Sequence, residues 1–390
     1  MGFFKKLGTM ISGKDDAVKP KVEKVDLKDL GIEIEVSFND DIQIGENKII
    51  AIPSVYHEQF EEIPGVMEKF AKTLFLNSLP ELCPIKEPDK YHTYLKWVAK
   101  IDDPTGYHAK MVEEGYLEKP EYRKILNSKK VTELKEILGE LNLAKSGTKG
   151  ALINRIIENT SEEESMKIIE NFNGYVLSGK GLNFIRENYD YVQLHDLNLI
   201  KIEISVNEYG YNKSKLNDDS KFEDVISYTL REHIEKSSPN VDPLYFEFAH
   251  YDFAKFSEKT RNYAESILSY MVALYISTSG IKSKDSIVFY KSKAKHSKFD
   301  VESIELAART TYLFAGAADG IKDLKDYYKD EMVDEIFESI KLPVNILTKD
   351  DFKVILNEIM LNRDYDEDKI NKILYDKFME YIYKLPGGYR

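Results

Sequence analysis

The spacing of hydrophobic residues is most regular between residues 131 and 158. The first part places an apolar residue every three or four positions, as one buried helix face requires: Val131, Leu134, Ile137, Leu138 and Leu141. The pattern stops in the small-residue sequence AKSGTKG and resumes at Leu152, Ile153, Ile156 and Ile157. Thr148 stands where a helix N-cap is expected. The pattern predicts two helices that are joined by a short loop and share one small core.

The remaining chain divides into a strand-rich part and a longer helical part. Residues 31–54 are rich in β-branched side chains around a turn sequence, which predicts strands. Residues 55–116 have mostly helical spacing, and we expect their Trp97 to belong to the core. Residues 173–188 predict a short extended piece, a turn and a helix. Five amphipathic segments after residue 196 predict helices at 222–237, 302–321, 331–343, 349–361 and 366–386.

A helical hairpin is predicted at residues 249–278. Its small and aromatic residues fall near the spacing of a tetratricopeptide unit, which it resembles: Phe253, Ala254, Tyr263, Tyr270 and Ala273. One such unit buries its faces only against neighbouring helices, which the flanking segments would supply. The apolar run from Ile267 to Ile276 is well short of the about 18 residues of a membrane span, so it predicts a buried helix.

These patterns predict a mainly α, multidomain chain with a small β-containing N-terminal part. A length of 390 residues exceeds one typical core. The expected parts are an amphipathic segment and linker, an α+β domain, the helix–loop–helix module, a strand–turn–helix connector and a C-terminal helical domain. Their expected bounds are 1–30, 31–126, 127–162, 163–195 and 196–390.

Composition limits the classes of function. The net charge of −13 argues against a general binder of polyanions, so any contact with nucleic acid needs a local basic surface. The single cysteine excludes a disulfide framework and fits a cytoplasmic location. Residues 1–14 have apolar side chains near one helical face; they are either a frayed end or a weak membrane or partner contact.

Two sequences resemble motifs of phosphate or metal binding, but each lacks a residue that its motif requires. GYVLSGKG has Gly181 where a phosphate-binding loop needs a hydroxyl residue. DYDEDK has Lys369 where a calcium loop needs glycine, so its acidic residues instead favour a helix start. No two histidines are three or four positions apart, and nothing in the sequence marks Cys83 as a nucleophile. We therefore expect no enzymatic activity, no cofactor and no metal. The alternative is a site assembled from residues that are far apart in the sequence.

The loop at residues 143–149 carries a local reversal of charge. Residues 129–158 contain six Lys or Arg residues and four Glu residues within a strongly acidic chain. Lys145 and Lys149 flank Gly147, and the amides of a helix start let a phosphate approach closely there. Arg155 lies two turns further along. The alternative is an ordinary solvated helix start that needs no ligand.

The same residues resemble a SAP domain, a helix–loop–helix module associated with DNA binding. The resemblance rests on the leucine and isoleucine stripe, the Ser146-Gly147 loop, and the following Lys149, Leu152 and Arg155. It implies that the loop and the start of the second helix face DNA. The residues that it nominates are Lys145, Ser146, Gly147, Thr148, Lys149 and Arg155.

The flanking segments DPTGYHAKMVEEGYL and GYVLSGKGLNFIREN resemble SAP-containing proteins of low-GC Gram-positive bacteria and their mobile elements. That group has no assigned activity. We therefore expect a non-enzymatic protein whose module contacts duplex DNA and whose C-terminal helices bind a protein partner. The DNA of a low-GC bacterium would be AT-rich. Two alternatives stay open, namely an interaction scaffold in which the module is structural and an enzyme of unrecognised class.

Overall fold

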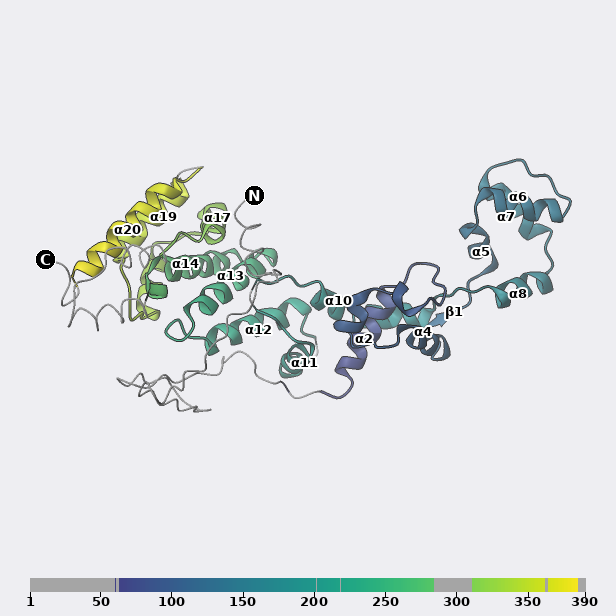
Figure 1. Ribbon diagram of the computed structural model, residues 1–390, viewed down its shortest axis with the longest axis horizontal. Coiled ribbons are helices and arrows are strands. Elements are labelled where there is room, and N and C mark those ends of the chain that lie inside the picture. The colour runs from purple at the N-terminus through teal and green to yellow at the C-terminus, as the bar shows by residue number, and fades with distance from the viewer. Residues whose placement is uncertain are drawn as a thin grey trace, which may run out of the picture. The chain divides into compact units, whose positions relative to one another are not determined.

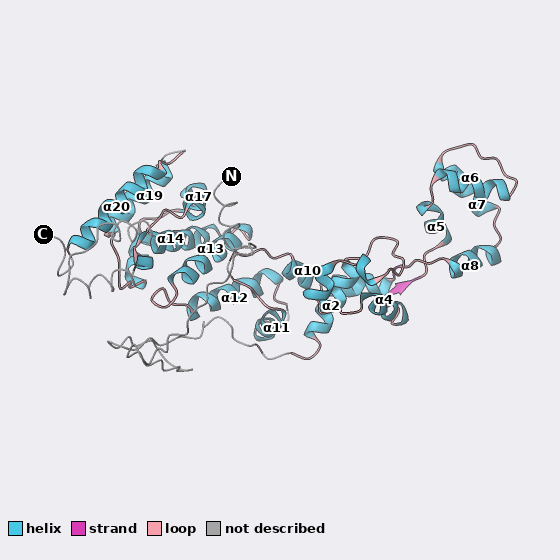
Figure 2. Cartoon of the chain, in the orientation of Figure 1, coloured by secondary structure: helices cyan, strands magenta, loops and turns pink. Residues whose placement is uncertain are grey.

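The computed structural model describes residue 60 and residues 63–200, 202–217, 219–283, 311–361 and 364–384. The strands expected at 31–54 and the amphipathic segment at 1–14 lie outside these ranges. Helices make up most of the described chain, which confirms the predicted mainly α class (Figure 2). Within these ranges, none of the helices combines the length and the hydrophobicity needed to cross a membrane.

The described chain begins with helices that pack around α2. The elements up to residue 118 are α2 (Val66–Asn77), η2 (Pro88–Lys90), α3 (Thr93–Trp97), α4 (Pro104–Glu113) and β1 (Leu117–Glu118). Helix α2 is buried from Phe70 to Leu76 and contacts α3. Helix α4 starts at Pro104 because Asp103 accepts the N–H of Gly106 and proline suits the first helical position.

A second group of helices completes this packing after a long excursion of the chain. It consists of β2 (Val176–Leu177), α9 (Gly179–Glu187), α10 (Asp190–His195) and α11 (Val206–Lys215). Helix α2 contacts α9, α10 and α11. Strands β1 and β2 pair antiparallel, with Leu117 opposite Leu177. Residues 119–175 are therefore an insertion between β1 and β2. The segments before and after this insertion pack together around α2, and the paired strands β1 and β2 join its two ends.

The excursion holds the predicted module. The helices of this excursion, which follow β1 in the chain, are α5 (Tyr122–Ser128), α6 (Val131–Glu140), α7 (Lys149–Glu158) and α8 (Glu162–Asn171) (Figure 1). From here on, the module means α5–α8. Lys119 Nζ donates to the carbonyl of Phe172 at 2.6 Å, which joins the two ends of the excursion. The domain boundaries expected from the sequence stay a prediction.

The sequence GYVLSGKG forms a strand and a helix start, as expected. Ser178 caps α9 by accepting the N–H of Gly181 at 3.1 Å. A Cβ atom on Gly181 would stand 2.3 Å from the carbonyl oxygen of Tyr116. The glycine that interrupts the phosphate-loop motif is thus required by the close packing of α9 against the backbone of Tyr116, between α4 and β1.

The C-terminal part contains the largest hydrophobic core. Its helices are α12 (Phe222–Lys236), α13 (Pro243–Lys259), α14 (Tyr263–Thr278), α17 (Ala315–Asp323), α18 (Glu331–Ser339), α19 (Lys349–Leu361) and α20 (Glu367–Tyr383), with η3 (Ile281–Ser283) and η4 (Lys325–Tyr327). Helices α13 and α14 lie side by side (Figure 1), and α14 is buried at every position from Ser269 to Thr278. The predicted hairpin and buried helix are confirmed, and the tetratricopeptide likeness stays a prediction.

The acidic stretch before α20 is a helix start. The side chain of Asp366 accepts the N–H of Lys369 at 3.1 Å. This contact confirms the expectation that the acidic residues of DYDEDK start a helix.

Buried polar side chains fix how the helices pair. Glu247 on α13 is fully buried; it accepts a hydrogen bond from the Tyr312 hydroxyl at 2.8 Å and pairs with Lys282 at 2.5 Å. On the other side of α13, His233 bridges Glu208 and Tyr245 at 2.8 and 2.7 Å, which joins α11, α12 and α13. Neither cluster follows from hydrophobic spacing, because each unites residues that are far apart in the sequence.

The expectation that Trp97 is a core residue is wrong. Its side chain is 69% exposed, whereas Leu95 is almost fully buried. Helix α3 has only five residues, so a single turn offers one inward position, and Leu95 takes it. Lys96 Nζ lies 5.5 Å from the centre of the Trp97 ring.

Candidate nucleic-acid interface

The module has a small aliphatic core. Its buried residues are Leu126, Leu134, Leu138, Leu152, Ile153 and Ile156. All but Leu126 come from the two helices that the periodicity predicts. Leu126 belongs to α5, and Tyr122 of the same helix packs against the cluster. Helix α5 therefore closes a core that α6 and α7 alone would leave open.

The end of α6 sets the path of the loop. Asn142 has a left-handed conformation with φ of 58°, the usual way to stop a helix. The N–H of Leu143 donates to the carbonyl of Leu138 at 2.7 Å, and the N–H of Asn142 donates to that of Gly139 at 3.1 Å. These two bonds and the packing of Leu143 on the core form a Schellman motif.

The start of α7 is open to solvent. Thr148 caps the helix by accepting the N–H of Ala151 at 3.4 Å, as the sequence predicts. Gly147 has φ of 126°, and a Cβ there would stand 3.3 Å from the Cβ of Ala151. Gly150 has open space around its Cβ position. The first amides of α7 have no partner inside the helix, so this exposed end carries a partial positive charge.

The cations of the loop differ in their contacts. Lys145 is exposed, and its ammonium lies over Gly139, where a Cβ would be 2.4 Å away. Lys149 is also exposed, and its Nζ donates to the carbonyl of Asn127 at the end of α5 at 2.7 Å. In the described ranges, no carboxylate forms an ion pair with Lys145, Lys149 or Arg155. The positive charge of the loop is therefore not neutralised locally by the described chain.

Arg155 binds the loop itself. Its Nη1 donates to the carbonyl of Ala144 and, at 3.0 Å, to that of Ser146. The sequence nominated Arg155 as a DNA contact and gave no sign of this second role. The sequence could not show this role because Arg155 donates to backbone carbonyls, which every residue has, so no particular residue type marks the contact. The arrangement brings all six nominated residues to one loop and its following helix.

Acidic residues gather on a different element of the module. Helix α8 begins with Glu162, Glu163 and Glu164. The carboxylate of Glu164 accepts hydrogen bonds from the N–H and hydroxyl of Ser161, and these bonds lower the pKa of Glu164. These carboxylates stabilise the N-terminal end of α8 because their negative charges interact favourably with the helix dipole. The three carboxylates at the start of α8 thus lie on a different helix from the cations of the α6–α7 loop.

Residues with other chemistry lie in structural positions. Cys83 is buried, its thiol donates to the carbonyl of Tyr175 at 3.1 Å, and burial raises its pKa to about 11. His108 is buried, and burial followed by the charge of Lys86 lowers its pKa to about 4. Across the ranges given above, His, Cys, Asp and Glu side chains form no group of three that could hold a metal ion.

Comparison with known proteins identifies the module alone. The family model of the SAP domain matches residues 125–160. No curated protein and no solved structure matches the chain. The match includes Leu126, all of α6 and α7 and the loop between them. Residues 125–160 are therefore a SAP domain, a module associated in general with nucleic-acid binding.

Proposed function

We propose that this chain is a non-enzymatic protein that uses its SAP module to contact the backbone of duplex DNA. The observation that carries the proposal is the exposed, uncompensated positive charge at the α6–α7 loop. Lys145 and Lys149 are exposed there, beside an open helix start, and have no ion pair in the described chain. A DNA phosphate would supply the missing negative charge.

Each nominated residue has a distinct role in this proposal. Lys145 and Lys149 contact phosphates, and the amides from Ser146 to Lys149 approach the backbone where Gly147 leaves room. Thr148 fixes the start of α7. Arg155 acts mainly by holding the carbonyls of Ala144 and Ser146, so it positions the loop.

The expected affinity is weak and depends on salt. Two or three phosphate contacts give little affinity and almost no sequence preference, because backbone contacts carry no base information. The net charge of −13 opposes binding further. Useful affinity therefore needs a second attachment, by oligomerisation or through a tethering partner.

The C-terminal helices are proposed to provide that attachment by binding a protein partner. The proposal also includes AT-rich duplex DNA as the target and the cytoplasm of a low-GC Gram-positive bacterium, or a mobile element in it, as the setting. Its support is the likeness of the flanking segments and the Lys-, Ile-, Asn- and Tyr-rich composition.

Fluorescence anisotropy with a labelled AT-rich duplex at low salt tests the proposal. We expect Lys145→Ala to weaken binding several-fold, because it removes one phosphate contact. The matched control is Lys167→Ala, which removes an exposed lysine from the acidic helix α8 of the same module. Equal binding by the two variants would show that the loop does not contact DNA.

An interaction scaffold is the second candidate, and one observation favours it. A hollow of about 780 Å³ lies beside α2, α3 and the start of α11, with Met67, Phe70, Val98 and Ile202 among its lining residues. Trp97 and Ile200, which also line it, are 69% and 60% exposed. Large exposed apolar side chains around a hollow are typical of protein interfaces. Failure of the wild-type chain to bind any duplex at low salt would favour this function.

A further inference from the structure

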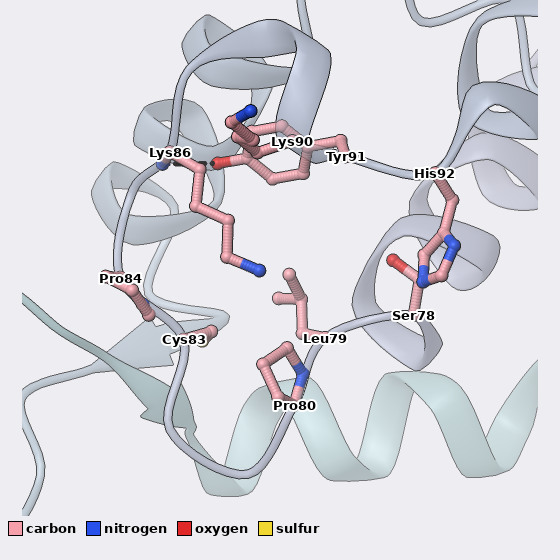
Figure 3. Close-up of a pocket in the computed structure, with 9 residues that line it drawn as sticks. All are labelled: Ser78, Leu79, Pro80, Cys83, Pro84, Lys86, Lys90, Tyr91 and His92. Atoms are coloured by element: carbon pink, nitrogen blue, oxygen red, sulfur yellow. Dashed lines mark hydrogen bonds between the residues drawn. The ribbon is translucent and has the colours of Figure 1, made fainter.

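A second hollow lies between the end of α2 and helix η2 and has a different chemistry. Its volume is about 270 Å³. The apolar side of its wall includes Leu79, Pro80 and Pro84, and the basic residues on the wall are Lys86, Lys90 and His92 (Figure 3). No carboxylate belongs to this lining. The hollow therefore joins an apolar wall to an excess of positive charge.

Lys86 supplies the charge that faces the interior. Figure 3 shows its side chain running toward the middle of the surrounding residues, near Leu79. Within the described chain, its ammonium has neither an ion pair nor a hydrogen bond. Lys90, in contrast, pairs with Asp89 at 3.1 Å. Lys86 is thus a half-buried cation without a counter-ion.

The backbone of Lys86 is fixed on both sides. Its N–H donates to the Tyr91 hydroxyl at 3.1 Å (dashed in Figure 3), and its carbonyl accepts from the Thr105 hydroxyl at 2.8 Å. The Tyr91 hydroxyl also bonds to Nδ1 of the buried His108 at 2.8 Å. These contacts hold the backbone of Lys86 in place before any ligand arrives, which lowers the part of the entropic cost of binding that comes from ordering the loop.

We propose that this hollow binds a small phosphorylated molecule. Lys86 contacts the phosphate, with His92 contributing from the wall, and the organic part packs against Leu79 and Pro80. A phosphate monoester carries a charge of about −1.5 to −2 near neutral pH, which suits several basic groups better than a carboxylate does. The proposal is independent of DNA binding by the module.

The phosphate could come from a free molecule or from a DNA backbone. The small volume of the hollow favours the free molecule, because a duplex cannot enter it. Phenyl phosphate and inorganic phosphate are suitable probes for isothermal titration calorimetry on the full chain. We expect phenyl phosphate to bind more tightly than inorganic phosphate, because only the former uses the apolar wall.

Lys86→Met removes the charge and keeps an unbranched stem. We expect it to weaken phenyl phosphate binding about tenfold or more, because hydrogen bonds to charged groups contribute this much. Lys86→Arg should restore most of the binding. The control Lys96→Met removes a lysine near Trp97, outside the lining, and should bind as the wild type does. The melting temperature should stay unchanged in Lys86→Met, since the ammonium has no described partner to lose.

Three results would overturn the proposal. The first is no binding of phenyl phosphate by the wild type, and the second is equal binding by Lys86→Met and the wild type. The third is a Lys86→Met variant that keeps its affinity for phenyl phosphate and loses affinity for a DNA duplex. That third result would assign Lys86 to the DNA backbone, and the small-molecule assignment would be wrong.

Discussion

The SAP module and the helices outside it bury different kinds of side chain. Every buried residue between residues 122 and 171 is aliphatic, and no polar or charged side chain is buried there. We call the described helices outside this range, α2–α4 and α9–α20, the helical frame. The frame buries His108, Glu208, Glu247 and Asp252 among other polar residues.

This difference shows what determines each region. The module is specified by apolar spacing and by caps, both of which are local in the sequence. The frame is specified also by buried polar partners that come from distant segments. Asp252 on α13, for example, accepts the N–H groups of Ile200 and Ile202 at 2.7 and 3.0 Å. Loss of one partner in the frame therefore leaves a buried polar group unsatisfied, which has no counterpart in the module.

The largest expected effect comes from breaking the buried pair in the frame. Glu247→Ala leaves Lys282 without its carboxylate and Tyr312 without its acceptor. We expect the free energy of unfolding of the frame to fall by about 3–5 kcal/mol, because a half-broken buried pair leaves an uncompensated charge. Urea denaturation followed by far-ultraviolet circular dichroism measures the change.

Asp334→Ala is the matched control for this prediction. Asp334 pairs with Lys349 at 2.9 Å, and both side chains are about half exposed. An exposed pair contributes less than about 1 kcal/mol, so this variant should unfold almost as the wild type does. If Glu247→Ala lowered the free energy of unfolding as little as Asp334→Ala does, the frame would not depend on its buried polar pairs. The proposed difference between the frame and the module would then be wrong.

A cavity in the module should have a large but local effect. Leu138 is fully buried in the module core. Leu138→Ala should cost about 2–5 kcal/mol, from lost burial and from the cavity left behind. Hydrogen exchange monitored by mass spectrometry should show loss of protection in α6 and α7 and unchanged protection in α13 and α14. The control Val131→Ala truncates a residue that is 40% exposed on the same helix and should leave α6 and α7 protected. Equal loss of protection throughout the chain would show that the module and the frame unfold together.

Acid should destabilise the frame before the module. Burial lowers the pKa of His108 to about 4, and residues 122–171 contain no histidine. Above about pH 6.5 both folded and unfolded His108 are neutral; below it only the unfolded state takes up the proton. Burial also lowers the pKa of His250, on α13, to about 3, so the unfolded frame takes up two protons that the folded frame does not. Stability of the frame should therefore fall by about 2.7 kcal/mol per pH unit from about pH 6.5 down to about pH 4.

The variant His108→Asn isolates this contribution. It should lose about half of the slope of unfolding free energy against pH, with the rest left to His250, whereas His92→Gln, which changes an exposed histidine, should keep the full slope. Urea denaturation followed by Trp97 fluorescence reports on the frame. An unchanged slope in His108→Asn would assign the acid sensitivity to other groups.

The smallest expected effect on stability distinguishes Arg155, on α7, from Lys145, in the loop. Arg155→Ala removes the hydrogen bonds to Ala144 and Ser146 and should lower the stability of the module by about 1 kcal/mol. Lys145→Ala should change it by less than about 0.5 kcal/mol, because Lys145 is exposed and has no ion pair in the described chain. Equal stability of the two variants would contradict a positioning role for Arg155.

The module could be predicted from the sequence because its determinants are local. The stripe on α6, the Thr148 cap and the loop at Gly147 all follow from spacing and residue type. The contribution of Leu126 was missed because α5 precedes the periodic stretch and is only one short helix. The contact of Arg155 with loop carbonyls was missed because it depends on the fold of the loop.

The frame could be predicted only as a series of helices. Hydrophobic spacing gave α12, α18, α19 and α20, but nothing in it pairs Glu247 with Lys282 or joins β1 to β2. Trp97 was misplaced for a related reason. A hydrophobic residue on a helix of one turn faces the core or the solvent according to its neighbours, and here Leu95 fills the core position.

The salt dependence of DNA binding tests the central claim most directly. The logarithm of the association constant should fall linearly with the logarithm of salt concentration, with a slope of about −0.9 for each phosphate contact. We predict a slope of about −2 to −3 for the wild type and one lower in magnitude by about 1 for Lys145→Ala. The slope for Lys167→Ala should equal that of the wild type. Equal slopes for Lys145→Ala and the wild type would contradict contact between this loop and the DNA backbone.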